Sequence, residues 1–263
     1  MAETAAEART DEDSILQTEG LTKKFGELVA VEAVDLDIER GEFRSVIGPN
    51  GAGKTTLFNL ISGALTPTDG RIYVASEDVT GLDPYERVGY GLARSFQLTT
   101  VFDGLTVREN VRLAAQSIAL GDMNERALMF ADKNGFGDIN DRTDDALARI
   151  GLADAADERA STLAYGDRRR LEIGLVLATD PEVVLLDEPT AGMSSDETSA
   201  TIALIEKVLA EKTLVLVEHD VELVMEISDR ITVLHQGRVL AEGPPEAISA
   251  DDDVQEAYLG GYE

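Results

Sequence analysis

The sequence has no cysteine and only two histidines. Without cysteine the chain can have no disulfide framework, thiol nucleophile or cysteine metal site, which fits a reducing cytoplasm. Long apolar runs are also missing: the longest are a few residues, too short to cross a bilayer, and nothing resembles a signal peptide. Any role at a membrane is therefore expected to act through a partner.

Basic residues are scarce as well. The 263 residues include 51 Asp and Glu against 23 Lys and Arg, a formal net charge of −28. This charge would repel free nucleic acid and excludes it as a partner. An acidic patch for a basic partner would be clustered, whereas acidic residues extend from Glu3 to Glu263, which favours a halophilic protein adapted to a salty cytoplasm. Folding and activity are then expected to need salt that screens self-repulsion.

The clearest motif is the stretch from Ser45 to Thr56, Ser-Val-Ile-Gly-Pro-Asn-Gly-Ala-Gly-Lys-Thr-Thr. An apolar strand ends at Ile47, a glycine-rich turn follows, and a helix opens at Lys54, which is the spacing of a phosphate loop. Glycines let backbone N–H groups converge on one anion, and the helix adds its positive dipole end. We expect Lys54 to reach the β- and γ-phosphates and the Thr55 hydroxyl to face Mg²⁺. An ordinary glycine-rich turn is the alternative interpretation.

The length allows one large α/β domain with an appended subdomain. Residues 1–13 are charged and alanine-rich, and we expect a flexible acidic tail. Alternating apolar residues predict antiparallel strands over 14–19 and 28–38. Phe25 lies between them, and its ring either belongs to the core or stacks on adenine; the residues alone leave both open.

Later segments predict helices, a hairpin and a helical end. The pattern is helical from residue 106 to about 152, interrupted by the polar stretch 132–145, which we expect to be a flexible excursion. A helix is expected over Asp167–Ala178, whose simplest interpretation is a capped helix with a solvated arginine face. Residues 231–241 predict a hairpin, and a terminal helical stretch follows.

Polar residues at strand ends are the remaining candidates. Asp187 and Glu188 follow the apolar run 183–186, and carboxyl ends of buried parallel strands are where α/β sheets bind ligands. We therefore expect this carboxylate pair to be functional. His219 also follows an apolar strand, although a lone histidine there is more often structural. Gln97 lies in a polar context that by itself indicates only a solvated loop.

Taken together and in order, these segments resemble the nucleotide-binding subunit of ATP-binding cassette (ABC) transporters. The resemblance runs from about Ile15 to Leu259. It points to the branched-chain amino acid uptake subfamily through Leu-Ala-Tyr-Gly with Arg-Arg-Leu-Glu-Ile, Ala-Gly-Met, Val-Glu-His-Asp, Leu-Val-Met-Glu-Ile-Ser-Asp-Arg and Ala-Tyr-Leu-Gly. It implies an α/β fold of the P-loop NTPase, ABC-ATPase type, with a mainly parallel RecA-like core, an antiparallel β subdomain and an α-helical subdomain.

The resemblance also implies domain bounds. A cassette would span residues 14–240, and a C-terminal helical tail residues 241–263. Within the cassette we expect the antiparallel β subdomain at about 14–45 and 71–80, the core at about 43–97 and 180–235, and the helical subdomain at about 98–179.

Roles follow from the resemblance residue by residue. Glu188 would polarise the attacking water, and His219 would contact the γ-phosphate and fix the geometry of Glu188. Mg²⁺ would be held by Thr55 and, through water, by Asp187, while Gln97 would sense the metal and pass the nucleotide state to the membrane subunit. ATP would stack its adenine on Phe25 and lie in a cradle of Gly48, Pro49, Asn50, Gly51, Ala52, Gly53, Lys54, Thr55 and Thr56.

The segment Ala164, Tyr165, Gly166 and Asp167 would act in trans. In this family two cassettes dimerise head to tail, so that this segment of one closes over the γ-phosphate bound by the other. The general signature is Leu-Ser-Gly-Gly-Gln, and here Asp167 places a carboxylate where glutamine is usual. Ser194 likewise stands where Asp or Asn is usual.

The implied function is ATP hydrolysis that powers uptake of branched-chain amino acids, or related amino acids and amides. The implied partners are a second cassette, identical or paralogous, two transmembrane permease subunits and, indirectly, a solute-binding protein, with the chain peripheral at the cytoplasmic face of the membrane. Two alternatives are a soluble ABC-class ATPase that remodels a cytosolic assembly and the cassette of an exporter. The acidic surface and the lack of a second cassette speak against the first.

Overall fold

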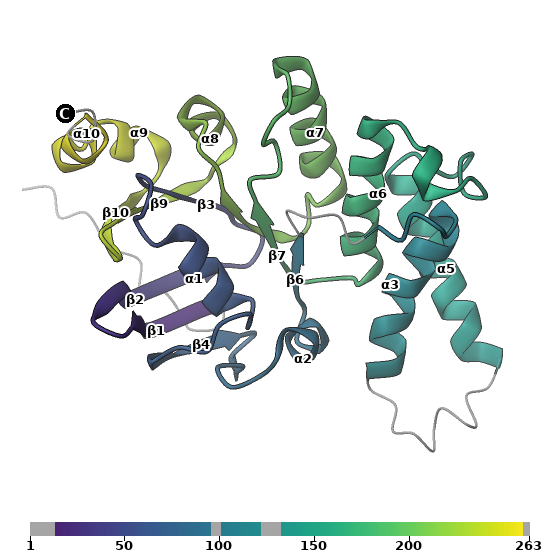
Figure 1. The fold of residues 1–263 in the computed structure, drawn as a ribbon, viewed down its shortest axis with the longest axis horizontal. Helices are drawn as coiled ribbons and strands as arrows, with labels where there is room; N and C mark the ends of the chain where they lie inside the picture. Colours follow the sequence, from purple (N-terminus) through teal and green to yellow (C-terminus); the bar gives the residue numbers. More distant parts are fainter. Residues whose placement is uncertain (1–13, 96–100, 122–132, 260–263) are drawn as a thin grey trace, which may run out of the picture.

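The computed structural model describes residues 14–95, 101–121 and 133–259, which form two sheets and their surrounding helices (Figure 1). The strands are β1 (Ser14–Phe25), β2 (Leu28–Glu39), β3 (Phe43–Ile47), β4 (Asp69–Val74), β5 (Glu77–Asp78), β6 (Leu92–Ser95), β7 (Val183–Asp187), β8 (Thr213–Val217), β9 (Arg230–His235) and β10 (Arg238–Gly243). The helices are α1 (Lys54–Ile61), α2 (Pro84–Gly89), α3 (Val107–Gly121), α5 (Lys133–Arg149), α6 (Tyr165–Ala178), α7 (Ser195–Val208), α8 (Val221–Ile227), α9 (Pro245–Ser249) and α10 (Asp252–Leu259).

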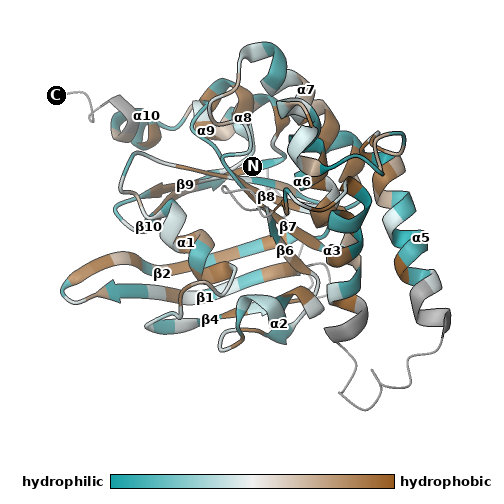
Figure 2. Ribbon diagram, turned by 45° about the vertical axis from the view of Figure 1, so that its right-hand side comes forward, coloured by the Kyte–Doolittle hydropathy of each residue, from teal (hydrophilic) through white to brown (hydrophobic). Residues whose placement is uncertain are grey.

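The larger sheet has the order β10-β9-β3-β8-β7-β6, and only its β9–β10 pair is antiparallel. The five-residue strands β7 and β8 each contain four apolar residues and are buried at every position, as strands of a covered parallel sheet are. Successive side chains alternate between two clusters: Val183 packs with α1 and the smaller sheet, and Val184 packs with the helices on the other face. Hydrophobic residues accordingly run along these strands in Figure 2.

The smaller sheet has the order β2-β1-β4-β5 and is antiparallel. Its first strand continues to Phe25 rather than ending near residue 19 as predicted. It pairs with β2 from Ser14 opposite Glu39 to Phe25 opposite Leu28, with register shifts along the way. These bulges break the two-residue alternation, so the pattern understated the length of the strand. α1 lies between the two sheets (Figure 1).

The helical region α3, α5 and α6 lies beside the β6 edge of the larger sheet (Figure 1). The expectation of a flexible excursion over 132–145 is wrong from residue 133 onward, because α5 covers it. Ile139, Thr143 and Leu147 recur at helical spacing and are all buried, and the Thr143 hydroxyl donates to the Ile139 carbonyl at 2.6 Å. The polar residues between them form the outer face of the helix, and they dominated the sequence pattern.

The strand β10 and then the helices α9 and α10 form the last part of the described chain. β10 extends to Gly243, so the helical end begins at Pro245 instead of residue 241. The predicted cassette bounds at residues 14 and 240 stay a prediction. None of the helices in the described ranges combines the length and the apolar composition that a bilayer crossing requires.

The helix α1 ends at Ile61, and a buried arginine satisfies its last carbonyls. Arg87 of α2 is 1% exposed and donates to the carbonyls of Leu60 at 2.8 Å and Ile61 at 2.6 Å. It also donates to the carbonyls of Leu82 and Thr80. Burial lowers the pKa of the Arg87 guanidinium to about 10, so it stays charged at neutral pH.

Replacing Arg87 by lysine should destabilise the fold. One ammonium cannot reach carbonyls on three sides, so buried acceptors lose their donors, and the free energy of unfolding should fall by about 2–3 kcal/mol. Thermal unfolding followed by circular dichroism should show a melting temperature lower by about 5–10 °C. Arg108→Lys is the matched control, because Arg108 pairs with Asp144 at an exposed position. Equal melting temperatures of the two variants would contradict this role.

Candidate functional site

The phosphate loop lies between β3 and α1, where glycine is required by close backbone approaches. Gly48 has φ 152°, and a Cβ there would lie 2.2 Å from the Leu234 carbonyl oxygen. Gly53 has φ 106°, and a Cβ there would lie 2.5 Å from the Ala30 carbonyl oxygen. Any side chain at these two positions would push the loop away from β9 and β2. The packing therefore fixes the loop conformation against two neighbouring backbones.

The loop fits a triphosphate. α1 begins at Lys54 with Gly53 as its N-cap, no side chain caps it, and its first turn contains no acidic residue, so its first N–H groups face an anion unopposed. The Lys54 side chain is 6% exposed, and its Nζ donates to the carbonyls of Gly48 at 2.6 Å and Pro49 at 3.1 Å. Burial lowers the pKa of Lys54, and the nearby Glu188 carboxylate opposes this shift. A buried cation thus lies beneath the loop.

A neighbouring turn holds the loop in place. The Gly237 N–H, in the turn between β9 and β10, donates to the Ala52 carbonyl at 2.9 Å. The Glu32 N–H of β2 donates in turn to the Gly237 carbonyl at 2.8 Å. The loop, the hairpin turn and the smaller sheet are therefore joined by backbone hydrogen bonds. Asn50 and Thr55 remain exposed on the open side of the loop.

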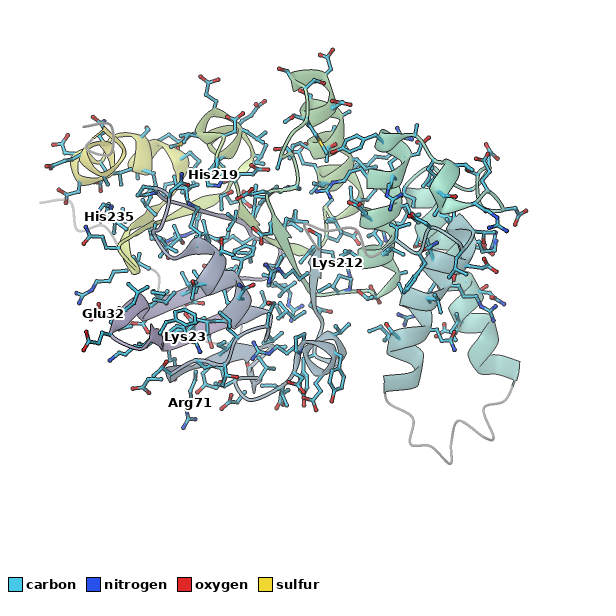
Figure 3. The ribbon with its side chains drawn as sticks, viewed as in Figure 1. Lys23, Glu32, Arg71, Lys212, His219 and His235 are labelled. Atoms are coloured by element: carbon cyan, nitrogen blue, oxygen red, sulfur yellow. The ribbon has the colours of Figure 1, made fainter. Side chains whose placement is uncertain are left out.

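Glu188 and His219 are brought together at the carboxyl edge of the larger sheet. Glu188 directly follows β7, and His219 comes two residues after β8 and just before α8 (Figure 3). The His219 Nε2 and the Glu188 Oε1 lie 2.8 Å apart, within hydrogen-bond distance. Glu188 has φ 46°, an uncommon conformation for a residue with a side chain, and its N–H donates to the Val217 carbonyl. Strain of this kind is concentrated at functional sites.

Two residues that the sequence did not reveal, the buried Glu218 and the half-buried Arg169, support this pair. Glu218 is 5% exposed and accepts hydrogen bonds from both the backbone N–H and the hydroxyl of Thr190, at 3.0 and 2.7 Å. It thereby ties the segment that carries His219 to the loop after Glu188. Arg169 of α6 donates to the Pro189 carbonyl of the same loop at 2.6 Å. In the sequence, Glu218 stands out only as a charged residue that follows an apolar strand. Arg169 stands out only as the middle one of three consecutive arginines.

Asp187 ends β7 with its side chain 3% exposed and paired with an arginine. Arg94 Nη2 donates to Asp187 Oδ2 at 2.7 Å. Thr55, at the start of α1, lies at the same edge of the sheet, because the strand order places β3 two strands from β7. A hydroxyl and a carboxylate suit Mg²⁺, which uses few protein ligands beside phosphates and waters. The described ranges contain no group of three or more His, Cys, Asp or Glu side chains that could hold a metal ion.

Phe25 ends β1 and is 48% exposed, so it is not a core residue. The Lys23 ammonium lies 5.3 Å from the centroid of its ring. Lys23 belongs to β1 of the smaller sheet (Figure 3). Gln97, predicted to sense the metal, lies outside the described residues.

The segment Ala164 to Asp167 is not brought to the phosphate loop of its own chain. α6 begins at Tyr165, two residues before the predicted start, so Asp167 lies in its first turn. Ala164, Tyr165 and Gly166 are exposed, and α6 packs on α3, α5 and α7, away from α1. The Asp167 Oδ1 and the Arg170 Nε lie 3.9 Å apart, and this partly exposed ion pair contributes little to stability. Ser194 caps α7, where its hydroxyl and N–H both bind the Glu197 carboxylate.

An apolar groove of about 410 Å³ lies between the sheet and the helical region. It is lined by residues of α2, β6, α3 and α6, among them Val88, Arg94, Leu113 and Val176, together with the exposed Phe102. The groove begins beside Ser95, the last described residue before the segment that contains Gln97.

Comparison with known proteins agrees with this geometry. The family model described as "ABC transporter" matches residues 31–191, and one described as "Branched-chain amino acid ATP-binding cassette transporter" matches residues 238–263. The chain is 42% identical over 249 residues to the high-affinity branched-chain amino acid transport ATP-binding protein LivG of Escherichia coli (strain K12), covering 94% of this chain and 98% of that protein. BraF of Pseudomonas aeruginosa, with the same description, is also 42% identical, over 251 residues, 94% of this chain and 98% of BraF.

A solved structure has the same fold. The ATP-binding cassette MJ1267 of an ABC transporter, crystallised in its ADP conformation, superposes with a TM-score of 0.77 at 31% identity, over 94% of this chain and 99% of that one. The family model covers more than half of the chain, and the relatives cover nearly all of it. With a phosphate loop, a signature helix and a strand-end carboxylate pair in this order, the chain belongs to the ABC transporter family, as one of its ATP-binding subunits.

Proposed function

We propose that this chain is the ATP-hydrolysing subunit of an importer for branched-chain amino acids or related amino acids and amides. The observation that carries the catalytic part is the Glu188–His219 pair at 2.8 Å, at the sheet edge beside the buried Lys54. The solute class rests on the relatives LivG and BraF, whose names describe branched-chain amino acid transport.

Each side chain then has a role at a stated atom. The Glu188 carboxylate orients and polarises the attacking water, and the His219 imidazole fixes that carboxylate while it reaches the γ-phosphate. Lys54 and the first N–H groups of α1 stabilise the charge on the phosphates. Thr55 and Asp187, together with Gln97, would hold Mg²⁺, which neutralises charge on the β- and γ-phosphate oxygens. Phe25 offers an exposed ring to adenine, and the loop from Gly48 to Thr56 holds the phosphates.

We propose that a second cassette completes the site, either an identical chain or a paralogue. The exposed signature segment, Ala164 to Asp167, lies far from the phosphate loop of its own chain, so its helix N-terminus can reach a triphosphate only on another chain. Arg169 links this signature helix to the loop after Glu188 within one chain. When the signature segment of one chain closes on the nucleotide bound by its partner, the change would thereby reach the catalytic loop of its own chain.

We further propose that the apolar groove receives a segment of a permease subunit at the cytoplasmic face of the membrane. An importer subunit must contact the part that crosses the bilayer, and none of the described helices can do so itself. The groove is lined in part by Ser95, two residues before Gln97 in the sequence, and Gln97 is the residue proposed to sense the nucleotide. Two permease subunits and a solute-binding protein would complete the transporter.

Substituting Glu188 by glutamine should abolish turnover and keep ATP binding. The amide preserves size and can still accept a hydrogen bond, but it is neutral and cannot polarise or take a proton from the attacking water, so hydrolysis should fall by at least about 100-fold. With Mg²⁺ and ATP the variant should elute as a nucleotide-bound dimer in size-exclusion chromatography. Lys54→Ala should bind ATP weakly and stay monomeric under the same conditions, because it lacks the buried cation. Normal turnover by the glutamine variant would overturn the catalytic assignment.

Substituting Leu113 by aspartate should uncouple the subunit from transport. Leu113 lines the groove and is 43% exposed, so a charge there should repel an apolar partner without disturbing the core. Cells that carry only this variant should lose uptake of labelled leucine, while the purified variant still hydrolyses ATP. Leu240→Asp is the matched control, since Leu240 is 37% exposed on β10, away from the groove.

The same experiment separates the alternatives. If deletion of the gene leaves leucine uptake intact, the assignment to leucine import fails, and leucine efflux from loaded cells then tests the exporter alternative. A soluble remodelling ATPase would affect neither uptake nor efflux. Retention of uptake by the Leu113 variant would reject only the groove as the docking site, and the importer assignment would stand.

We also propose that the acidic surface is an adaptation to high salt. The net charge of −28 is spread along the chain, and the surface ion pairs of the described residues are mostly exposed arginine–carboxylate pairs such as Arg142 with Asp138 and Arg149 with Asp145. Self-repulsion of this kind weakens when the Debye length falls to about 3 Å at 1 M salt.

Raising KCl from dilute buffer to molar concentration should raise the melting temperature by about 10 °C, equivalent to roughly 3–4 kcal/mol. Sucrose at the same osmolality is the control, because it stabilises by exclusion without screening charge. A melting temperature that is flat in KCl, or that rises equally in sucrose, would contradict the proposal.

A further inference from the structure

Arg94 joins three parts of the nucleotide site. Its Nη1 donates to the Asn59 Oδ1 at 2.7 Å and the Ser62 hydroxyl at 3.0 Å, both in or directly after the phosphate-loop helix α1. Its Nη2 donates to the Asp187 Oδ2 at 2.7 Å. One guanidinium therefore connects the strand β6, the helix that follows the phosphate loop, and the carboxylate proposed to hold Mg²⁺.

The strand register explains this convergence. β6 and β7 are parallel, and Arg94 lies opposite Leu185. Neighbouring residues in a sheet share a face, and Leu185 and Asp187 share one because they are two apart. That face packs on α1, since Leu185 belongs to the cluster that contains Leu57 and Leu60. Arg94 and Asp187 therefore both point toward α1 at the carboxyl end of the sheet.

The environment makes the contact strong and directional. The Asp187 side chain is 3% exposed and the Arg94 side chain 15%. In such a place a charged pair is weakly screened by solvent, and a planar guanidinium fixes the direction of each bond. Two further acceptors, Asn59 on α1 and Ser62 directly after it, hold the guanidinium itself, so it cannot rotate freely with the carboxylate. The Asp187 carboxylate is thus oriented by a group that is itself held.

We propose that Arg94 is a positioning residue that orients the Asp187 carboxylate for Mg²⁺. The inference deepens the proposed ATPase function and rests on it. Among the described residues, the hydrogen bonds of Arg94 reach the nucleotide site through Asp187, through Asn59 of α1 and through Ser62 directly after it. Residues that orient a metal-binding carboxylate typically affect metal affinity or activity by about 10–100-fold. Because Arg94 also lines the apolar groove, the orientation of Asp187 depends on a residue that a bound partner segment would touch.

The decisive variant is Arg94→Lys. Lysine keeps the positive charge, so the electrostatic field at Asp187 changes little, but a single ammonium cannot hold Asn59, Ser62 and Asp187 in a fixed plane. If orientation matters, the Mg²⁺ concentration for half-maximal ATP hydrolysis should rise about tenfold. Binding of a fluorescent ATP analogue in EDTA should change by less than about twofold, since no metal is present and the phosphate loop is intact.

A readout independent of turnover uses Mn²⁺ as the metal probe. Electron paramagnetic resonance of Mn²⁺ with ATP is measured in a Glu188→Gln background, so that ATP is not consumed. Arg94→Lys should weaken Mn²⁺ binding about tenfold, whereas Arg108→Lys, the same substitution at an exposed ion pair, should leave it unchanged. With Asp187→Asn added, Arg94→Lys should weaken Mn²⁺ binding by no more than about twofold further, because its route of action is gone.

Two results would overturn the role of Arg94. One is a metal dependence like that of the wild type in Arg94→Lys, even if the melting temperature falls, since that would leave only a structural contact. The other is an equal effect of Arg94→Lys with and without Asp187→Asn, since the arginine would then act elsewhere. Failure of the wild-type chain to hydrolyse ATP would instead reject the proposed function, so the two failures are distinguishable.

Discussion

The close approach of the phosphate loop to two other backbones is the constraint on which the site depends. Gly48 and Gly53 lie where a Cβ would collide with the carbonyls of Leu234 and Ala30, so the loop can only take its shape once β9 and β2 are in place. The backbone bonds through Gly237 join the same three segments. The cradle is therefore a product of both sheets, and the smaller sheet has a structural role beyond presenting Phe25.

The same edge of the larger sheet supplies everything else that lies near the cradle. Asp187 ends β7, and Glu188 and His219 follow parallel strands. Arg94 holds Asp187, His219 contacts Glu188, and the buried Glu218 holds the segment of His219. Within one chain, the signature helix α6 contacts this edge through Arg169, which donates to the loop after Glu188. In the proposed dimer, one chain thus presents a nearly complete site and lends its signature helix to the other.

Sequence spacing was enough to predict the parts of the site that depend on local chemistry. The phosphate loop and the carboxylates at the end of β7 are encoded within a few residues, so their place in the fold was predictable. Arg94 and Glu218 were missed because their partners lie 93 and 28 residues away in the chain. α5 was misjudged for a related reason: its buried face is narrow, and the pattern is dominated by residues that face solvent.

The charge of the chain sets a last condition on how this site works. A chain of net charge −28 must attract a polyanion, so binding depends on cations close to the phosphates. Lys54 and the α1 N-terminus provide this positive charge at the phosphate loop, and Arg94 balances the negative charge of Asp187 beside it. At molar salt the Debye length is about 3 Å, which suppresses long-range repulsion but leaves contacts of that length largely intact. High salt would therefore weaken the long-range repulsion between the chain and ATP and leave the contacts of the cradle in place.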